Sequence, residues 1–252
     1  MHIIYRLCDK PGKDRPAWFS KRACLRNLLR VFGPEHEYHF LCDTGGRPNP
    51  KGPELGTWNM AQAGYDIAKS CRDMDLTYQI VCHDSGSNTA SFRFAIDYAC
   101  KLDGWLYLVE DDFLHRAGAG EVLADMIELA GPGDYLTLYD HPDKYLLTGH
   151  GTYPGRPGLG YVEVSHLCHW RTTISTVATF AVSAATLCAD REIWEKWSSD
   201  DFGRPVDSHA FRELSTVKHH HVWSSIPGFA THCENRYLTP LWDWEKEVSD
   251  DG

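Results

Sequence analysis

The sequence lacks the long apolar runs that mark membrane proteins. Within its 252 residues, no uninterrupted apolar stretch reaches the roughly 18 residues that a membrane-spanning helix needs. The first residues, Met1 to Arg6, show no signal-peptide pattern and have the composition of a first strand. We therefore expect no membrane segment and a cytoplasmic protein.

Cysteine pairs at metal-binding or redox spacing are also missing. There are nine cysteines, an odd number, and none forms a Cys-x-x-Cys motif. Most of them stand in apolar surroundings typical of strands or helices. We interpret them as reduced core thiols, and not as a disulfide or zinc framework.

An excess of positive charge is absent as well. The chain has 25 Lys and Arg residues against 35 Asp and Glu residues, a net charge of −10, which argues against general nucleic-acid binding. The charges are unevenly distributed, because eight basic side chains in the first thirty residues face only Asp9 and Asp14. This basic segment can hold phosphates, and a solvated helix face is the alternative interpretation.

Internal repeats and low-complexity segments are absent too. Apolar segments rich in branched residues alternate with segments of helical spacing, a pattern that builds β-α-β units. It predicts a single α/β domain, Rossmann-like, with a mixed, mainly parallel sheet flanked by helices. The expected strands are 2–8, 38–42, 77–82, the apolar run of 104–113 up to its three acids, 135–139 and several within 162–182. The expected helices are 17–32, 59–70, one from Phe92, 120–129, 191–197 and 205–214.

What the sequence does contain is an apolar run that ends in three acids. The stretch from Gly104 to Phe113 is typical of a strand buried on both faces, and it reaches Glu110, Asp111 and Asp112. Carboxylates at such a place resist losing water unless a cation accompanies them, and Mg²⁺ and Mn²⁺ prefer carboxylate oxygens. Ligands of open parallel sheets bind at the carboxyl ends of the strands. The stretch predicts a metal site there, and a water-facing surface turn is the alternative.

Two later segments lack regular patterns. Residues Thr148 to Gly160 are rich in Gly and Pro, and we expect a mobile loop that covers the substrate. Residues 242–252 form an acidic tail that we expect to be frayed.

The order of elements, with Glu110-Asp111-Asp112 after the fourth strand, resembles that of GT-A glycosyltransferases. The triplet is similar to the Asp-x-Asp-type motif of that family. The loop Ser85-Gly86-Ser87-Asn88, with Ser91 and Arg93, is similar to the preceding segment of family-2-like members, and His232 stands where many members place their last metal ligand. The resemblance divides the domain into a nucleotide-sugar-binding half (1–115) and an acceptor-binding half (116–241).

The resemblance implies a metal-dependent transfer of sugar from a nucleotide-sugar donor, UDP-sugar being the expected one. Mn²⁺ or Mg²⁺ would be held by Asp112 and His232 and would stabilise the charge of the leaving diphosphate. A structural histidine in a turn is the alternative for His232. The other implied donor-binding residues, around base, ribose and phosphates, are Arg6, Cys8, Asp43, Asn88, Arg93, Glu110 and Asp111.

On the acceptor side, we predict Asp207 as the general base that removes the proton of the acceptor hydroxyl. A helix N-cap is the alternative role for this residue. Trp170 and Arg171 are expected to form part of the acceptor surface, with core packing as the alternative for Trp170. The stereochemistry of transfer stays open.

The acceptor class also stays open between a saccharide, a protein and a hydroxymethylated pyrimidine in viral DNA. The last possibility depends on a looser resemblance of 139–145 and 224–228 to virus- and phage-type transferases. A nucleotidyltransferase is a second candidate function, for which 10–13 offers only a faint version of the usual loop. A non-catalytic nucleotide-binding module is the third, and it would leave the three acids without a role.

Overall fold

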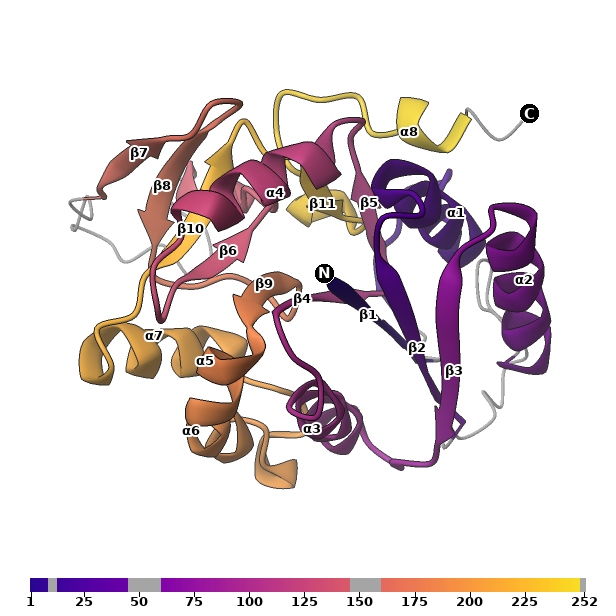
Figure 1. Cartoon of the computed structure of the whole chain (residues 1–252), viewed down its shortest axis with the longest axis horizontal. Coiled ribbons are helices and arrows are strands. Elements are labelled where there is room, and N and C mark those ends of the chain that lie inside the picture. Colours follow the sequence, from indigo (N-terminus) through magenta and orange to yellow (C-terminus); the bar gives the residue numbers. More distant parts are fainter. Residues whose placement is uncertain (9–12, 45–59, 146–159, 250–252) are drawn as a thin grey trace.

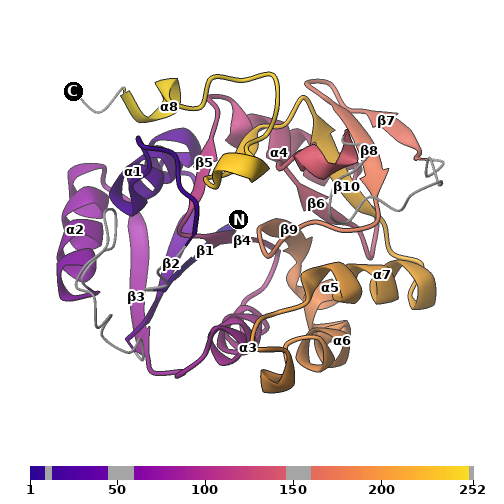
Figure 2. The same cartoon turned by 180° about the vertical axis from the view of Figure 1, so that it is seen from behind.

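The fold is described from a computed structural model that covers residues 1–8, 13–44, 60–145 and 160–249. A nine-stranded sheet lies between two layers of helices (Figures 1 and 2). The strands are β1 (His2–Leu7), β2 (Glu37–Asp43), β3 (Thr77–His83), β4 (Trp105–Glu110), β5 (Phe113–His115), β6 (Tyr135–Thr137), β7 (Val162–Val164), β8 (His169–Thr173), β9 (Phe180–Ser183), β10 (Val222–Ile226) and β11 (Ala230–His232). The α-helices are α1 (Lys21–Phe32), α2 (Met60–Asp73), α3 (Asn88–Ala99), α4 (Ala119–Leu129), α5 (Ala184–Ala189), α6 (Arg191–Lys196), α7 (Asp207–Val217) and α8 (Lys246–Ser249), and the short 3-10 helices are η1 (Pro142–Lys144), η2 (Asp200–Phe202) and η3 (Asn235–Tyr237).

The strand order in the large sheet is β3-β2-β1-β4-β9-β6-β10-β8-β7. Strands β1 to β4 are parallel neighbours, as are β6 and β10, while β9 and β8 run in the opposite direction. The sheet is therefore mixed and mainly parallel, as the sequence predicts. Its parallel half brings the carboxyl ends of β1 and β4 side by side.

Alternation along β1 explains the two helical layers, because successive side chains of a strand point to opposite faces. Ile3, Tyr5 and Leu7 pack into a core with α1, α2 and α4, whereas Ile4 packs into a second core with α3, α5, α6 and α7. Arg6 lies on the same face as Ile4 but at the end of the strand, where the second core opens toward the carboxyl edge. The second core is aromatic where the helices meet, with Trp194 stacked on Phe180 at a centroid distance of 5.1 Å.

The apolar stretch 104–113 is divided in the structure. β4 ends at Glu110, Asp111 and Asp112 form the turn, and β5 then leaves the sheet to pair antiparallel with β11. The strand therefore ends at the three acids, as the sequence predicts. The register sets His232 opposite Phe113, which places the histidine next to Asp112.

The segment after residue 241 differs from the frayed tail that we expected. Trp244 is buried with Cys24, Leu114 and Cys233, and its Nε1 donates to the carbonyl of Thr239 at 2.8 Å. The segment thus packs against α1 and the β5–β11 ribbon as far as α8, and residues 250–252 lie outside the described residues.

Three other expectations concern disulfides, membrane-spanning helices and the loop 148–160. All nine cysteines are free thiols in the structure. Across the described ranges, no helix combines the length and the apolar content needed to cross a bilayer. Most of the expected loop Thr148–Gly160 lies outside the described residues.

Candidate functional site

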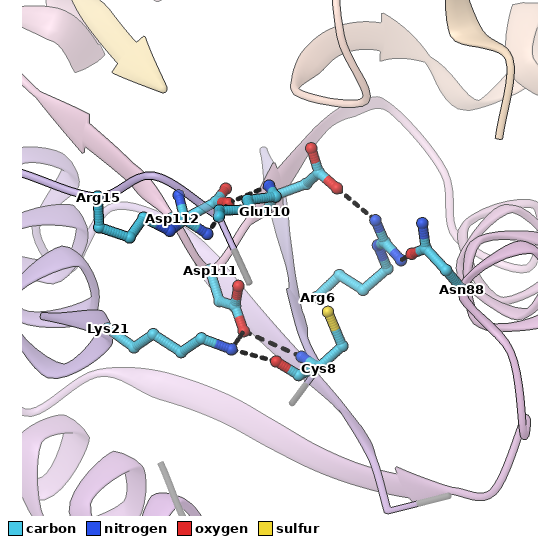
Figure 3. A pocket seen from close by; sticks show the side chains of 9 residues that line it. Arg6, Cys8, Arg15, Lys21, Asn88, Glu110, Asp111 and Asp112 are labelled. Carbon is cyan, nitrogen blue, oxygen red and sulfur yellow. Dashed lines mark hydrogen bonds and ion pairs between the residues drawn. The ribbon is translucent and has the colours of Figure 1, made fainter. Parts of the chain in front are cut away.

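A polar pocket opens at the carboxyl ends of β1 and β4, where the sequence places the acidic triplet (Figure 3). Acids from the β4–β5 turn face cations from β1, from the segment before α1 and from α1 itself. The lining residues are Arg6, Cys8, Lys13, Arg15, Lys21, Asn88, Glu110, Asp111 and Asp112.

Asp112 is the most highly connected acid in the pocket. Its Oδ2 accepts from Lys13 Nζ at 2.6 Å and from Arg15 Nη2 at 2.7 Å, and it lies 3.0 Å from His232 Nε2. The residue is only 3% exposed, and its Oδ1 meets no hydrogen-bond partner among the described residues. Burial alone would raise the pKa of this carboxyl, but the charges of His232, Lys13 and Arg15 hold it well below its ordinary value. Asp112 is therefore an anion in the folded protein.

His232 is held in position by its ring contacts. The imidazole stacks on Phe113 at a centroid distance of 5.3 Å and on Tyr237 at 6.1 Å, with both interplanar angles below 15°. The backbone N–H of Cys233 donates to the carbonyl of Asp112 at 2.8 Å, and this bond joins the end of β11 to the start of β5. Asp112 and His232 are thus a preorganised carboxylate–imidazole pair.

The Lys13 ammonium also lies at this pair. Its Nζ is 2.6 Å from Asp112 Oδ2 and 3.0 Å from His232 Nε2. The position between the two side chains therefore accommodates a cation, and Asp112 still has a buried oxygen to offer. Oxygen and neutral imidazole donors suit Mn²⁺ or Mg²⁺, so this donor set fits the expected ion, which would have to displace Lys13.

Asp111 has different contacts from Asp112. Its Oδ2 accepts from the backbone N–H of Cys8 and from Lys21 Nζ, both at 2.9 Å, and Lys21 also donates to the Cys8 carbonyl. Lys21 and Asp111 are each about 4% exposed. This buried ion pair fastens the end of β1 to α1 and to the acidic turn, and it leaves Asp111 with less freedom to contact a ligand than we expected.

Arg6 and Asn88 lie together at the other side of the pocket. Arg6 Nη1 donates to Asn88 Oδ1 at 2.9 Å, and its Nη2 pairs with Glu110. Asn88 is the first residue of α3, whose N-terminus is capped by the Ser87 hydroxyl accepting from the N–H of Ala90. A helix N-terminus and a guanidinium side by side favour an anionic ligand.

Asp207 comes from α7, in the C-terminal half of the domain. Loss of solvation and the nearby Glu110 carboxylate raise the pKa of Asp207 to about 7, against smaller opposing effects that include the charge of His232. The N-cap of α7 is Val206, while Asp207 occupies the first helical turn, where its Oδ1 accepts from the N–H of Ser208 at 2.7 Å. The alternative role as an N-cap was therefore wrong, and the residue has the properties of a general base near neutral pH.

Four other predicted site residues lie outside this pocket. Trp170 is completely buried in the core and donates to Ser165, so its expected role on the acceptor surface was wrong. Arg93 donates to the Ser198 carbonyl and to the Asp200 carboxylate and so ties α3 to η2. Arg171 pairs with Asp140 at 2.6 Å, on strand β8 of the antiparallel edge of the sheet.

Asp43 is the fourth, and it is buried at the end of β2. Its Oδ1 accepts from the N–H of Ser85, which orders the loop after β3. This contact is typical of an aspartate that orders a turn.

Sequence reasoning missed Lys13, Arg15 and Lys21 as individual site residues. Their signal was the excess of basic residues in the first thirty positions, which we noted but could not assign to the acids of residues 110–112. Arg15 also donates to the carbonyl of Cys233 at 2.7 Å, so it bridges the two halves of the domain. Long-range pairing of this kind becomes visible only when the fold brings the segments together.

No protein-family model matches this chain, and no curated protein matches it. Among solved structures it is similar to residues 1–349 of TarS from S. aureus, a GT-A-type glycosyltransferase, with a TM-score of 0.50 and 14% identity over 88% of this chain. The same TarS residues in complex with UDP-GlcNAc give a TM-score of 0.47 at 14% identity, covering 88% of this chain and 55% of that one. The chain spans 57% of the length of the first of these two structures. The single domain, with its mixed sheet between helical layers, therefore has a GT-A-like fold.

Proposed function

We propose that this chain is a glycosyltransferase that moves a sugar from a nucleotide-sugar donor to a hydroxyl acceptor. The observation that carries the proposal is the pocket at the carboxyl ends of β1 and β4, where anion-binding cations surround the Asp112–His232 pair. Asp207 supports it with a pKa of about 7 close to Glu110 and His232. The GT-A-like fold is consistent with the same chemistry, although a fold alone does not determine an activity.

The residues of the pocket have distinct roles in this proposal. Arg6 and the N-terminus of α3 bind donor phosphate oxygens, and Lys13 and Arg15 stabilise the negative charge that develops on the leaving diphosphate. Asp207 removes the proton of the acceptor hydroxyl as that oxygen attacks the anomeric carbon. Because an enzyme carboxylate activates the attacking hydroxyl directly, the proposal implies inversion at that carbon.

Asp112 and His232 are proposed to hold Mn²⁺ or Mg²⁺, whose chemistry there is to neutralise charge on the diphosphate oxygens. The charge balance of the pocket supports this addition. Four cations (Arg6, Lys13, Arg15, Lys21) face three acids of the β4–β5 turn, so the pocket is close to neutral on its own. A diphosphate together with a divalent ion adds little net charge, whereas either one alone would unbalance the site.

For the acceptor we propose a saccharide hydroxyl. Several basic residues of the N-terminal segment are engaged in ion pairs, Lys13 and Arg15 with Asp112, Lys21 with Asp111 and Arg22 with Asp66. Their charges are balanced by neighbouring acids, and the net charge of −10 opposes binding to nucleic acid. These observations weigh against a modified pyrimidine in viral DNA as the acceptor.

The product of donor turnover tests the proposal directly. A panel of nucleotide sugars is incubated with the protein, Mn²⁺ and mixed saccharide acceptors, with UDP-GlcNAc first in the panel. The proposal expects release of a nucleoside diphosphate, with Mn²⁺ required, and loss of release in Asp112→Asn. Release of pyrophosphate from a nucleoside triphosphate and a sugar phosphate would instead identify a nucleotidyltransferase. Binding without turnover would identify a nucleotide-binding module.

A further inference from the structure

A second group of polar side chains lies at the opposite edge of the sheet, at the amino ends of β1 and β2. His2 on β1 is in register with Glu37 on β2, and Ile4 is in register with His39. Residues two apart on a strand point to the same face, so Glu37 and His39 project on the side where His2 lies, beneath the end of α3. The donor pocket is at the other end of the same strands, so the two groups are separate.

The ligand atoms of these three side chains converge. His2 Nδ1 lies 3.0 Å from His39 Nε2 and 3.1 Å from Glu37 Oε2, and all three atoms lie within 4.8 Å of one another. In a tetrahedral zinc site with bonds of about 2.0–2.1 Å, ligand atoms are separated by roughly 3.3 Å. The observed spacing therefore needs little adjustment to surround a single ion.

Each imidazole has a polar partner for the ring nitrogen that does not face the other two ligand atoms. His39 Nδ1 lies 2.9 Å from the Tyr98 hydroxyl, which donates to Gln79 Oε1 at 3.3 Å. His2 Nε2 lies 3.5 Å from the Asp103 carboxylate. In the tautomers with protons on these two nitrogens, His39 Nε2 and His2 Nδ1 each present a lone pair.

In these tautomers, two imidazole lone pairs and a carboxylate oxygen face one another. This arrangement is repulsive unless a cation occupies the centre. Neutral imidazole and carboxylate are the donors that zinc prefers, and ligand imidazoles commonly bond a hydroxyl, carboxylate or carbonyl through their other nitrogen. Tyr98 and Asp103 supply such partners to both rings.

We propose that His2, Glu37 and His39 bind Zn²⁺, with water as the fourth ligand, and that the ion fastens the amino ends of β1 and β2 together. In the competing account no ion binds, and a protonated His2 shares the proton on its Nδ1 with His39 and Glu37. The two differ in whether the protein takes up zinc, so they can be separated without measuring activity.

The test is zinc competition against a chromophoric chelator, with protein that carries no histidine tag. All variants are made in an Asp112→Asn background, so that an ion at the donor pocket does not contribute. One Zn²⁺ per chain is expected. His2→Gln, at a partly exposed position, and Glu37→Gln, at an exposed one, should each weaken binding by more than about 100-fold. Tyr98→Phe, which removes only the partner of the His39 ring, should weaken it by about 10–100-fold.

His169→Gln is the matched control, because it removes an exposed histidine from strand β8. It should bind zinc like the parent protein. The melting temperature should rise with Zn²⁺ in the parent and in this control, and stay constant in His2→Gln and Glu37→Gln. Unchanged zinc affinity in both ligand variants, or no zinc bound by the parent at micromolar concentrations, overturns the proposal and leaves the shared proton.

Discussion

Asp207 is a carboxyl whose environment gives it a proton affinity suited to base catalysis. Its pKa of about 7 follows from lost solvation and from the Glu110 carboxylate. A base acts only when deprotonated, so kcat/KM should rise with pH through a value near 7 and level off above it. Asp207→Asn should lower kcat by roughly 100-fold or more with little change in donor affinity. A pH–rate profile of both proteins, combined with donor titration, checks this expectation.

The matched control for this variant is Asp201→Asn, because Asp201 is an exposed aspartate in η2. It should retain the wild-type rate and pH profile. If folded Asp207→Asn turns over at the wild-type rate, the base lies elsewhere.

The same raised pKa has a consequence for stability. Between about pH 4 and pH 7 the folded protein retains the Asp207 proton that the unfolded chain releases, so this residue lowers the free energy of unfolding as pH rises. Above pH 7 the Asp207 carboxyl is ionised in both the folded and the unfolded state, so it no longer makes the free energy of unfolding change with pH. Asp207→Asn should therefore lose less stability than wild type between pH 5 and pH 8 in urea titrations. Parallel curves for the two proteins would show that the pKa of Asp207 is not raised.

At the scale of elements, the Lys21–Asp111 pair joins α1, the end of β1 and the β4–β5 turn. Both side chains are buried, so removing one charge leaves the other unpaired in a place without water. Lys21→Met and Asp111→Asn should each lower the free energy of unfolding by about 3–5 kcal/mol. The double variant should lose less than the sum, because neither charge remains. Urea unfolding of the four proteins measures the coupling, and additive losses would show that the pair is not coupled.

The elements that the sequence revealed are those with a strong local pattern. The run from Trp105 to Val109 and the following acids were sufficient to predict β4 and a site at its carboxyl end, and the prediction of the site's position depended on the general geometry of parallel sheets. The β5–β11 ribbon was not predictable in the same way. Its strands are three residues long and its pairing joins segments more than a hundred residues apart, which no local periodicity records.

The same limit applies to individual residues of the site. His232 was identified because a family resemblance supplied its place, whereas Lys13 and Arg15 were visible only as part of a basic segment. Trp170 was misassigned because an exposed and a buried tryptophan look alike in a strand of mixed composition. Burial is decided by which face of β8 meets the core, and that depends on the whole sheet.

At the scale of the whole molecule, the C-terminal segment closes over the N-terminal half. Trp244 is 3% exposed among Cys24, Leu114 and Cys233, whereas Trp242 is 42% exposed and lies over the Arg116 guanidinium. Trp244→Ala should lower the free energy of unfolding by about 3–5 kcal/mol through the cavity that it leaves. Trp242→Ala is the control and should cost only about 0.5–1 kcal/mol. Equal losses in chemical denaturation would contradict this account of the segment.

The two edges of the sheet also have different chemistry. Acids, cations and a helix N-terminus gather at the carboxyl ends of β1 and β4, while the amino ends of β1 and β2 carry His2, Glu37 and His39. A ligand effect that depends on Asp112 therefore reports on the donor pocket alone.

The most direct test of the central claim is thermal stabilisation by nucleotide sugars with and without Mn²⁺, in wild type and in Asp112→Asn. A donor at 100 times its dissociation constant should stabilise the folded protein by about 2.7 kcal/mol. We predict that at least one nucleotide sugar raises the melting temperature of wild type in the presence of Mn²⁺, and that the variant shows no such rise. The absence of any shift across the panel, or an equal shift in Asp112→Asn, would contradict the proposed donor site.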